Sequence, residues 1–446
     1  MSLFLRFFRV AYEFAFQIGR YALCRSLYFF IPNRERRRAR IEKLRGKCLT
    51  DFLRHLGATY IKVGQILSSR PDLLPPYLTE ELASLQDRVP PFPYLETEKM
   101  FQEELGRSIE QCFTEFDKTP IAAASVAQVH RAKLPNGQEV AVKVQRPGVE
   151  KQVERDLAIL RFLAGIVELI PSARRMAFQE QVREFGAAIY AQLDFRIEAE
   201  NNRRFTANFG SLPYVRVPKL VDEFCTKRIL VMEFIRARKI ADVLGTIRVP
   251  RREMALRLFK IYTKMAFEDF FIHADMHPGN ILFDDDGNCY LLDVGLVNNV
   301  NQEYLPKFMR FNLAISQKDG PGVARAYVEE YGMHPRNYQE FETDCIAIMR
   351  SLDGKSAKEI EFGKYILEMF RMIRDHHLHL DPNVTLLNVA YITFEGMSRV
   401  FDPEFDIMQI YATEILRIIS QPRWKDVFQR HFGKPQSPAA GRTAAN

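Results

Sequence analysis

Apolar residues near the start of the chain recur at helical spacing. Between residues 3 and 22 they occupy one face of a predicted helix, at Phe4, Phe7, Phe8, Ala11, Phe14, Ala15, Ile18, Tyr21 and Ala22. Polar residues take the other face, at Arg6, Arg9, Glu13, Gln17 and Arg20. A basic run follows at residues 34–47. This pattern is typical of contact with an anionic membrane surface, but it also fits a helix packed on the protein core beside a solvated linker.

Short apolar runs later in the chain predict two hairpins. Residues 138–145 form an apolar run around Lys143, and a turn signal at residues 135–137 joins it to the segment that begins near Ala122. A second hairpin is predicted from residues 281–283 and 289–292, with an Asp-rich turn between them. Residues 217–221 and 228–232 are strand-like, long helices are expected between 149 and 209, and the chain beyond 236 is predicted to be mostly helical.

Acidic and amide side chains surround the second hairpin. Asp275 and Asn280 lie five residues apart in the loop before it, and Asp293 follows its last strand in the sequence Leu-Leu-Asp-Val-Gly. Phosphoryl transfer requires a carboxylate near the attacking oxygen and oxygen ligands for magnesium. A lone D-x-x-x-x-N is weak evidence, because these residues are also common in turns. The order of loop, strand, turn, strand and Asp-x-Gly nevertheless indicates a kinase-like nucleotide site.

A basic residue upstream fits the same site. Lys143 lies on a predicted strand, from which it can reach nucleotide phosphates, although a solvent-facing edge lysine would give the same pattern. Its ammonium needs an acidic partner, and Asp194 and Glu198 share one face of a predicted helix. We favour Glu198 as that partner.

The loop before this strand lacks the glycines of a typical kinase. Its residues are Ala122, Ala123, Ala124, Ser125 and Val126. Backbone N–H groups can still bind phosphate there, but each Cβ restricts φ and limits how closely the backbone approaches a ligand. We therefore expect a stiffer loop and an altered nucleotide geometry.

Composition is consistent with a large kinase-like protein. The chain has 446 residues, of which 47% are hydrophobic, enough for two lobes and extensions. Its net charge of +7 is modest and concentrated near residues 34–47, so we expect no nucleic-acid partner. The six cysteines form no C-x-x-C pair and no zinc-like spacing with histidine, which favours reduced thiols.

Targeting segments are not evident in the sequence. Charges interrupt the apolar residues after Ile407 well before the roughly 18 needed to span a bilayer. Arg6, Arg9 and Glu13 interrupt any signal-peptide core. We expect a cytoplasmic protein without a transmembrane helix or signal peptide, or one that is peripheral at the inner membrane.

Several of these motifs together resemble the UbiB (AarF-like, ADCK-type) family of atypical protein-kinase-like proteins. The resemblance adds a Lys-x-Gly-Gln element at Lys62, Gly64 and Gln65 and runs from about residue 50 to about residue 405. It implies an α+β, bilobal protein-kinase-like fold with a helical N-terminal extension. The expected parts are a basic amphipathic segment (1–48), the Lys-x-Gly-Gln extension (49–112), the small lobe (113–235), the large lobe (236–420) and a disordered tail (421–446).

The resemblance also implies residue roles. Lys62, Gly64 and Gln65 would belong to a helix that folds over the active site. Residues 122–126 and Lys143 would bind the phosphates of ATP or ADP, and the backbone at Glu233 and Ile235 would hold the adenine. Asp275 would be the catalytic aspartate, supported by the Lys143–Glu198 pair, and Asn280 and Asp293 would bind Mg²⁺. The family usually has Glu where this chain has Gln192, which can hydrogen-bond Lys62 but not pair its charge.

Three functions remain open at this point. The resemblance implies an Mg-dependent ATPase or phosphotransferase that supports isoprenoid-quinone (ubiquinone-type) biosynthesis or lipid homeostasis, with quinone-precursor lipids and quinone-biosynthesis proteins as partners. The alternative is a non-catalytic nucleotide-binding scaffold for a quinone-biosynthesis complex. A phosphotransferase of the aminoglycoside or choline kinase type would share the catalytic loop, but such enzymes lack the Lys62–Gln65 insertion.

Overall fold

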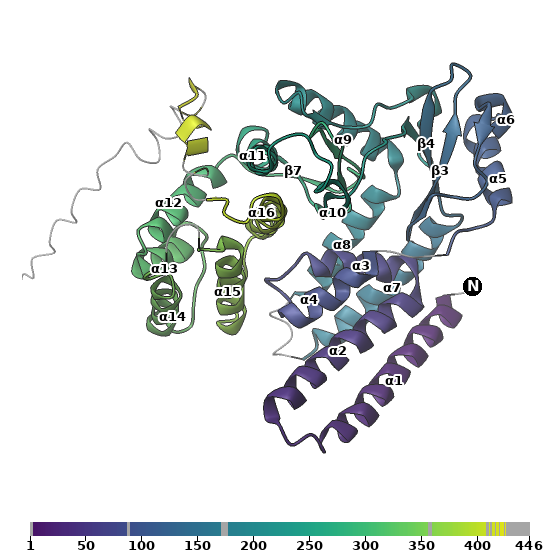
Figure 1. Cartoon of the computed structure of the whole chain (residues 1–446). Coiled ribbons are helices and arrows are strands. Elements are labelled where there is room, and N and C mark those ends of the chain that lie inside the picture. The colour runs from purple at the N-terminus through teal and green to yellow at the C-terminus, as the bar shows by residue number, and fades with distance from the viewer. Residues whose placement is uncertain are drawn as a thin grey trace, which may run out of the picture. The chain divides into compact units, whose positions relative to one another are not determined.

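The structure, a computed structural model, divides into two compact units (Figure 1). Unit 1 comprises Met1–Arg248 and His273–Val297, and unit 2 comprises Val249–Ile272 and Asn298–Asn446. The described residues are 3–86, 90–170, 177–355, 359–406 and ten single positions between 410 and 424. The tail predicted at 421–446 lies almost entirely outside them. The predicted lobe boundaries stay predictions; residues 236–248 and 273–297 share unit 1 with the predicted small lobe.

An antiparallel sheet forms the centre of unit 1. Its order is β1-β3-β4-β6, with β2 also paired to β3. The strands are β1 (Glu115–Phe116), β2 (Ala122–Ala123), β3 (Ala127–Lys133), β4 (Glu139–Gln145) and β6 (Ile229–Glu233). The predicted hairpin is confirmed, because β3 and β4 pair from Ala127 opposite Gln145 to Lys133 opposite Glu139.

Alternation along β4 determines which side Lys143 faces. Val140, Val142 and Val144 are fully buried in one cluster with residues of α5 (Tyr94–Leu105) and α6 (Ile109–Cys112). Because successive side chains of a strand point to opposite faces, Lys143 points to the other side of the sheet. There the second cluster includes Leu157 and Phe195, from α7 (Val149–Val167) and α9 (Phe195–Asn208).

A smaller sheet and its loops complete the strand structure of unit 1. Its order is β5-β9-β8, from β5 (Val215–Arg216), β9 (Cys289–Leu291) and β8 (Ile281–Phe283). The second predicted hairpin is therefore also confirmed, with Ile281 opposite Leu291. The chain passes between the two units after Arg248 and again within β7 (Phe271–His273) and β10 (Val297–Asn299).

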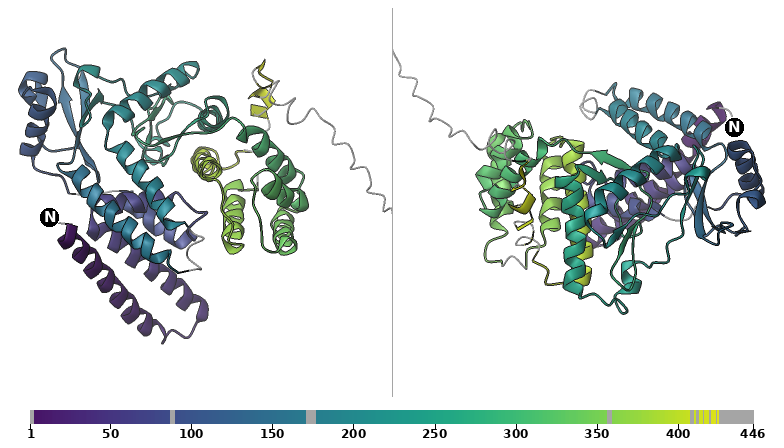
Figure 2. Two further views of the ribbon diagram at one scale, coloured as in Figure 1. Left: turned by 180° about the vertical axis from the view of Figure 1, so that it is seen from behind. Right: turned by 90° about the horizontal axis from the view of Figure 1, so that it is seen from above.

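Helices from the N-terminal part of the chain pack beside α7 and α8. They are α1 (Leu3–Tyr28), α2 (Arg34–Leu56), α3 (Ala58–Ser68), α4 (Pro76–Ala83) and α8 (Phe178–Gln192). The first two form an antiparallel hairpin, visible from both sides of the molecule (Figures 1 and 2). One cluster joins Val10 of α1 to Leu53, Tyr60 and Ile159. Residues 49–112, predicted as a helical extension, contain the end of α2 and the helices α3, α4, α5 and α6, and the bounds of that extension stay a prediction.

The structure shows which side of α1 meets the protein: Arg6, Val10 and Gln17 face inward, and most of its apolar residues face outward. Arg6, Val10 and Gln17 are its buried residues. The exposed apolar residues of α1 are Leu3, Phe4, Leu5, Phe8, Tyr12, Phe14, Phe16, Ile18, Leu23 and Leu27. The reason is an ion pair, since the buried Arg6 guanidinium donates to the buried Asp156 carboxylate of α7 at 2.6 and 2.9 Å. The helix thus packs on the protein, as one of the two interpretations of the sequence expected, but most of its apolar residues stay outside that contact.

Unit 2 is helical, as predicted for most of the chain beyond residue 236. Its longer helices are α11 (Arg251–Thr263), α12 (Tyr304–Ser316), α13 (Gly320–Glu329), α14 (Tyr338–Arg350), α15 (Phe362–Asp375) and α16 (Pro382–Phe401). α11 packs against α16, and Ser398 donates a hydrogen bond to the backbone oxygen of Ala255. None of the described helices is both long enough and apolar enough to cross a bilayer.

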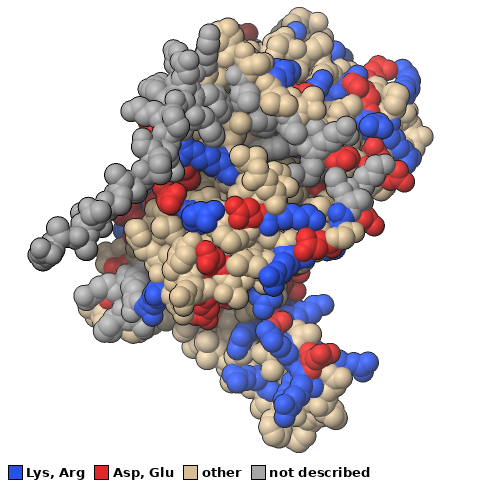
Figure 3. All heavy atoms as spheres, turned by 90° about the vertical axis from the view of Figure 1, so that its left-hand side faces the viewer, with Lys and Arg blue, Asp and Glu red and all other residues tan. Residues whose placement is uncertain are grey.

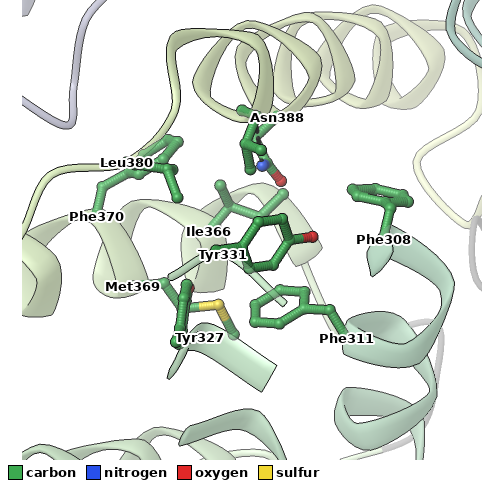
Figure 4. Close-up of a pocket in the computed structure, with 10 residues that line it drawn as sticks. Phe308, Phe311, Tyr327, Tyr331, Ile366, Met369, Phe370, Leu380 and Asn388 are labelled. Atoms are coloured by element: carbon green, nitrogen blue, oxygen red, sulfur yellow. Dashed lines mark hydrogen bonds between the residues drawn. The ribbon is translucent and has the colours of Figure 1, made fainter. Parts of the chain in front are cut away.

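Aromatic side chains converge on a pocket inside unit 2 (Figure 4). Phe308 and Phe311 come from α12, Tyr327 from α13, Met369 from α15 and Asn388 from α16. The free space is about 10 Å³, enough for one water molecule. This pocket is therefore part of the packed core and too small for a nucleotide.

Candidate active site

Lys143 lies between two carboxylates in unit 1. Its Nζ is 2.9 and 2.8 Å from the two oxygens of Glu198 and 3.2 Å from Oδ1 of Asp293. The side chains of Lys143 and Glu198 are 11% and 5% exposed, whereas that of Asp293 is 55% exposed. The predicted Lys143–Glu198 pair is therefore present, and Asp293 is its solvent-facing member. Asp194, the other candidate partner of Lys143, pairs with Arg196.

The charges of this triad depend on one another. Burial alone would lower the pKa of Lys143, but the charges of Asp293 and Glu198 outweigh it and raise the pKa. The Lys143 ammonium holds the pKa of Asp293 well below its usual value, with a further contribution from Lys62. Burial raises the pKa of Glu198, and Lys143 opposes that shift. The site thus keeps a permanent cation next to an ionised, accessible carboxylate.

The backbone after β9 turns sharply to place Asp293. This residue has φ of 47°, a left-handed conformation that is uncommon for a residue with a side chain. Asn201 of α9 donates a hydrogen bond at 3.0 Å to the backbone oxygen of Val294. A Cβ at Gly295 would lie 3.3 Å from Oε2 of Glu198 and 3.4 Å from Oδ1 of Asp293. Glycine at this position therefore lets the chain pass close to both carboxylates.

The loop before β8 presents Asp275 and Asn280. Buried His273 accepts a hydrogen bond on Nδ1 from the backbone N–H of Asp275 at 3.2 Å, and its Nε2 lies 3.4 Å from the backbone oxygen of Leu292. Burial lowers the pKa of His273, which keeps the imidazole neutral for these roles. The Asn280 amide donates to the backbone oxygen of Asp275 at 2.9 Å. His273 and Asn280 therefore hold the Asp275 loop against β9.

Oxygen atoms suited to Mg²⁺ remain available around this loop. Among the described residues, the side-chain oxygen of Asn280 accepts no hydrogen bond, and Asp293 uses only Oδ1 toward Lys143. Carboxylate and amide oxygens are the ligands that Mg²⁺ prefers, usually with phosphate oxygens and water. Asn280 and Asp293 therefore fit the magnesium role that the sequence predicts for them.

The Lys-x-Gly-Gln element lies on α3, and its lysine reaches Asp275. Nζ of Lys62 is 3.5 Å from Oδ2 of Asp275, and both side chains are largely buried. Nε2 of Gln65 donates to the backbone oxygen of Leu85 at 3.3 Å. A Cβ at Gly64 would lie 2.4 Å from a methyl group of Leu85, so this glycine allows α3 to pack closely. Lys62 therefore connects α3 to the catalytic loop, while Gly64 and Gln65 pack α3 against the segment at Leu85.

Gln192 does not make the contact expected of it. It is buried at the end of α8, its Nε2 has no hydrogen-bond partner, and no hydrogen bond joins it to Lys62 within the described residues. The physical reason is that Lys62 points at the Asp275 carboxylate, which is a stronger partner than a neutral amide.

The Ala-rich loop forms a tight turn between β2 and β3. The backbone N–H of Ala124 donates to the backbone oxygen of Ala127 at 2.7 Å. Among the described residues, the N–H groups of Ser125 and Val126 make no hydrogen bond. These two groups are therefore available for the phosphate role that the sequence predicts for residues 122–126.

The strand end at Glu233 is the predicted adenine position. Its N–H donates to the backbone oxygen of Lys219 at 2.8 Å, whereas the N–H of Ile235 has no partner within the described part of the chain. Ile235 is therefore the better donor for a base.

Sequence reasoning missed two positioning residues, Asn201 and His273. Both lie in motifs that carry predicted site residues, yet neither is charged in the site, so only their hydrogen bonds reveal their roles.

Two family models match parts of this chain. Residues 84–327 match the model of the ABC1 atypical kinase-like domain, and residues 345–406 match the UbiB helical domain. The kinase-like α+β fold predicted from the sequence is thereby confirmed.

Relatives of known name are similar over most of the chain. The "Probable protein kinase UbiB" of Marinobacter nauticus is 36% identical over 374 residues, which cover 81% of this chain and 68% of that protein. The protein of the same name from Azotobacter vinelandii is 35% identical over 395 residues, with coverage of 86% and 73%. A Mycobacterium tuberculosis protein solved in complex with erythromycin is 22% identical, covers 77% of this chain and 92% of its own, and has a TM-score of 0.47.

Proposed function

The chain belongs to the UbiB family of ABC1 atypical kinase-like proteins, and from that premise we propose that it is an Mg-dependent ATPase or phosphotransferase. The observation that carries the proposal is the Lys143 ammonium held between Glu198 and the accessible Asp293. A cation fixed in this way can bind phosphate oxygens, and the carboxylate beside it can bind the metal that accompanies them.

Each residue of the site would contribute one step of binding or chemistry. Lys143 would bind phosphate oxygens, assisted by the free N–H groups of Ser125 and Val126. Asn280 and Asp293 would hold Mg²⁺, which supplies charge neutralisation when bound. Asp275 would orient the attacking hydroxyl or water and accept its proton. The phosphoryl acceptor stays open, because the Asp275 carboxylate can accept a proton from a hydroxyl group or from water.

Asp275 would have to lose a partner before it can act. The Lys62 ammonium now lies 3.5 Å from its carboxylate, where a substrate oxygen would have to approach. We propose that the α3 element is regulatory and that turnover requires Lys62 to move away from Asp275. This arrangement also favours the second candidate, a non-catalytic nucleotide-binding scaffold, in which Lys62 would never leave.

Relatives of this chain are named "Probable protein kinase UbiB". We propose that this chain supports isoprenoid-quinone biosynthesis or lipid homeostasis, with quinone-precursor lipids or quinone-biosynthesis proteins as partners.

Membrane contact is proposed for the α1–α2 hairpin. The exposed apolar side of α1 includes Phe4, Phe8 and Phe16, and Figure 3 shows Lys and Arg side chains gathered at the bottom of its view, where the hairpin lies. Apolar and cationic groups side by side are complementary to an anionic bilayer surface. The protein would then be peripheral, at the cytoplasmic side of the inner membrane.

Nucleotide binding and turnover of the full chain test the proposal. Thermal shift with Mg-ATP and with Mg-ADP would be measured for wild type, Asp293→Asn and the control Asp286→Asn, whose carboxylate lies in the exposed turn between β8 and β9. We expect a Mg-dependent shift in wild type and Asp286→Asn that Asp293→Asn lacks. ATP hydrolysis by wild type, lost in Asp293→Asn, would support the enzyme. Binding without hydrolysis, with anionic vesicles present, would favour the scaffold.

A further inference from the structure

A polar cavity lies in unit 1 among α1, α2, α3 and α7, and no residue of the nucleotide site lines it. Its volume is about 310 Å³. Arg6 and Arg9 reach it from α1, Gln152 and Arg155 from α7, and Gly57 and Gly148 border it where α3 and α7 begin. The space is large enough for a phosphate group with a small organic substituent.

The cavity has more positive charge than its surroundings neutralise. Arg6 is paired with Asp156 and also donates to the backbone oxygen of Leu56 at 2.6 Å. Arg9 donates one N–H to the backbone oxygen of His55 at 3.0 Å. Half-buried Arg155 makes no hydrogen bond or ion pair with any described residue. Asp156 neutralises Arg6, and the charge of Glu13 reaches Arg9, but no described carboxylate pairs with Arg155. The Arg155 guanidinium therefore favours an anion in the space that it borders.

Two helix starts add donors to the same space. Gly57 and Gly148 are the N-cap residues of α3 and α7, and neither helix has a side-chain hydrogen bond at its cap. The first backbone N–H groups of a helix have no partner within the helix, and they carry partial positive charge. A Cβ at Gly148 would meet no atom within 4 Å, so the space above this helix start is open.

The amide of Gln152 supplies a neutral donor. Its Nε2 lies 3.5 Å from the position that a Cβ would take at Gly57, and its side chain makes no hydrogen bond within the described residues. Guanidinium, amide and backbone N–H groups together match the many acceptor oxygens of a phosphate.

We propose that this cavity binds a phosphate-bearing anion at Arg9, Gln152 and Arg155. The phosphate could belong to a soluble phosphate ester or to the headgroup of an anionic phospholipid, since the opposite side of α1 exposes its apolar residues. The site is independent of the proposed nucleotide site, because it shares no residue with it.

Binding of inorganic phosphate and of glycerol phosphate to the full chain is the first test. Isothermal titration at constant ionic strength would compare wild type with Arg155→Gln and with the control Arg107→Gln, which removes an equal charge from an exposed position between α5 and α6, outside the α1–α2 hairpin. We expect saturable binding that weakens about tenfold or more in Arg155→Gln and is unchanged in Arg107→Gln. Lys143→Met should retain the binding, which separates this site from the nucleotide site.

Co-sedimentation with vesicles then identifies the source of the phosphate. Phosphatidylglycerol vesicles would be compared with phosphatidylcholine vesicles for the same variants. A loss of phosphatidylglycerol binding in Arg155→Gln but not in Arg107→Gln supports a lipid headgroup. Weaker phosphate binding with unchanged vesicle binding supports a soluble ester. The proposal is overturned if wild type binds neither ligand, or if Arg155→Gln and Arg107→Gln behave alike in both assays.

Discussion

Arg6 and Lys143 are buried basic side chains of unit 1 with carboxylate partners, and their surroundings differ. Arg6 and Asp156 are both inaccessible, and the guanidinium also binds a backbone oxygen, so its donors are directed at the protein. Lys143 has two carboxylates, and one of them, Asp293, is mostly exposed. We call Arg6–Asp156 the closed pair and Lys143 with its two carboxylates the open pair. The closed pair anchors a helix, whereas the open pair can exchange a carboxylate contact for a ligand.

The Arg6–Asp156 pair also determines the orientation of α1. An arginine that is buried against Asp156 determines which face of the helix meets α7, and the apolar residues are left outside. In the active site the same kind of charge pairing leaves a carboxylate outside instead. Ion pairs thus determine which groups each region presents to its partners.

The largest effect is expected from breaking the closed pair. Asp156→Asn would leave the Arg6 guanidinium buried without a counter-charge and should reduce the free energy of unfolding by about 3–5 kcal/mol. Urea unfolding followed by circular dichroism measures this. Glu150→Gln is the matched control, because it lies on α7 in an exposed pair with Lys227 and should cost less than about 1 kcal/mol. Equal losses in both variants would show that Asp156 is not the anchor of α1.

The open pair should be less sensitive to the loss of one partner. In Glu198→Gln, Lys143 keeps Asp293, so we expect a loss of about 1.5–3 kcal/mol in unfolding free energy together with weaker Mg-ATP binding. The matched control is Glu200→Gln, two residues along α9 in an exposed pair with Arg203. Unfolding and nucleotide titration measure the two effects. Unchanged nucleotide affinity would contradict the role of Glu198 in orienting Lys143.

A smaller effect is expected from Lys62→Met. Removing the Lys62 ammonium frees the Asp275 carboxylate, and an ion pair as long as 3.5 Å is worth about 1 kcal/mol. If turnover requires this separation, ATP hydrolysis should rise on the order of fivefold. Lys43→Met, on the exposed side of α2, serves as the control. Lower hydrolysis in Lys62→Met alone would assign Lys62 to substrate binding instead of inhibition.

The smallest effect is the pH dependence of the open pair. Lys143 depresses the native pKa of Asp293 below the ordinary value of 3.8, so the pair stabilises the fold above that pH. Its contribution should be lost as the pH falls from 3.8 toward the native pKa. Solvent screens this contribution, because Asp293 is mostly exposed. Unfolding of wild type and Asp293→Asn between about pH 6 and 2 should therefore converge at the acid end; a constant difference would contradict the linkage.

Local patterns predicted much of the fold and of the site. The turn at 135–137 and the alternation in 138–145 identified the β3–β4 hairpin, and the spacing in 281–292 identified β8 and β9. The choice of Glu198 over Asp194 agrees with the contacts of both residues, since Asp194 pairs with its neighbour Arg196. Neither Asn201 nor His273 was identified, because a neutral hydrogen-bonding side chain has no distinctive sequence pattern.

The sequence by itself determined the residue types of the site and the helical periodicity of α1, because both are written in short segments. Only the tertiary structure decided that Lys62 meets Asp275, that Gln192 is left without a partner for its amide nitrogen, and that the polar face of α1 is the buried one. These outcomes depend on charges more than a hundred residues apart along the chain. Hydrophobic patterning predicts which face of a helix can be buried. A buried ion pair such as Arg6–Asp156 can reverse that choice, because each buried charge has a counter-charge.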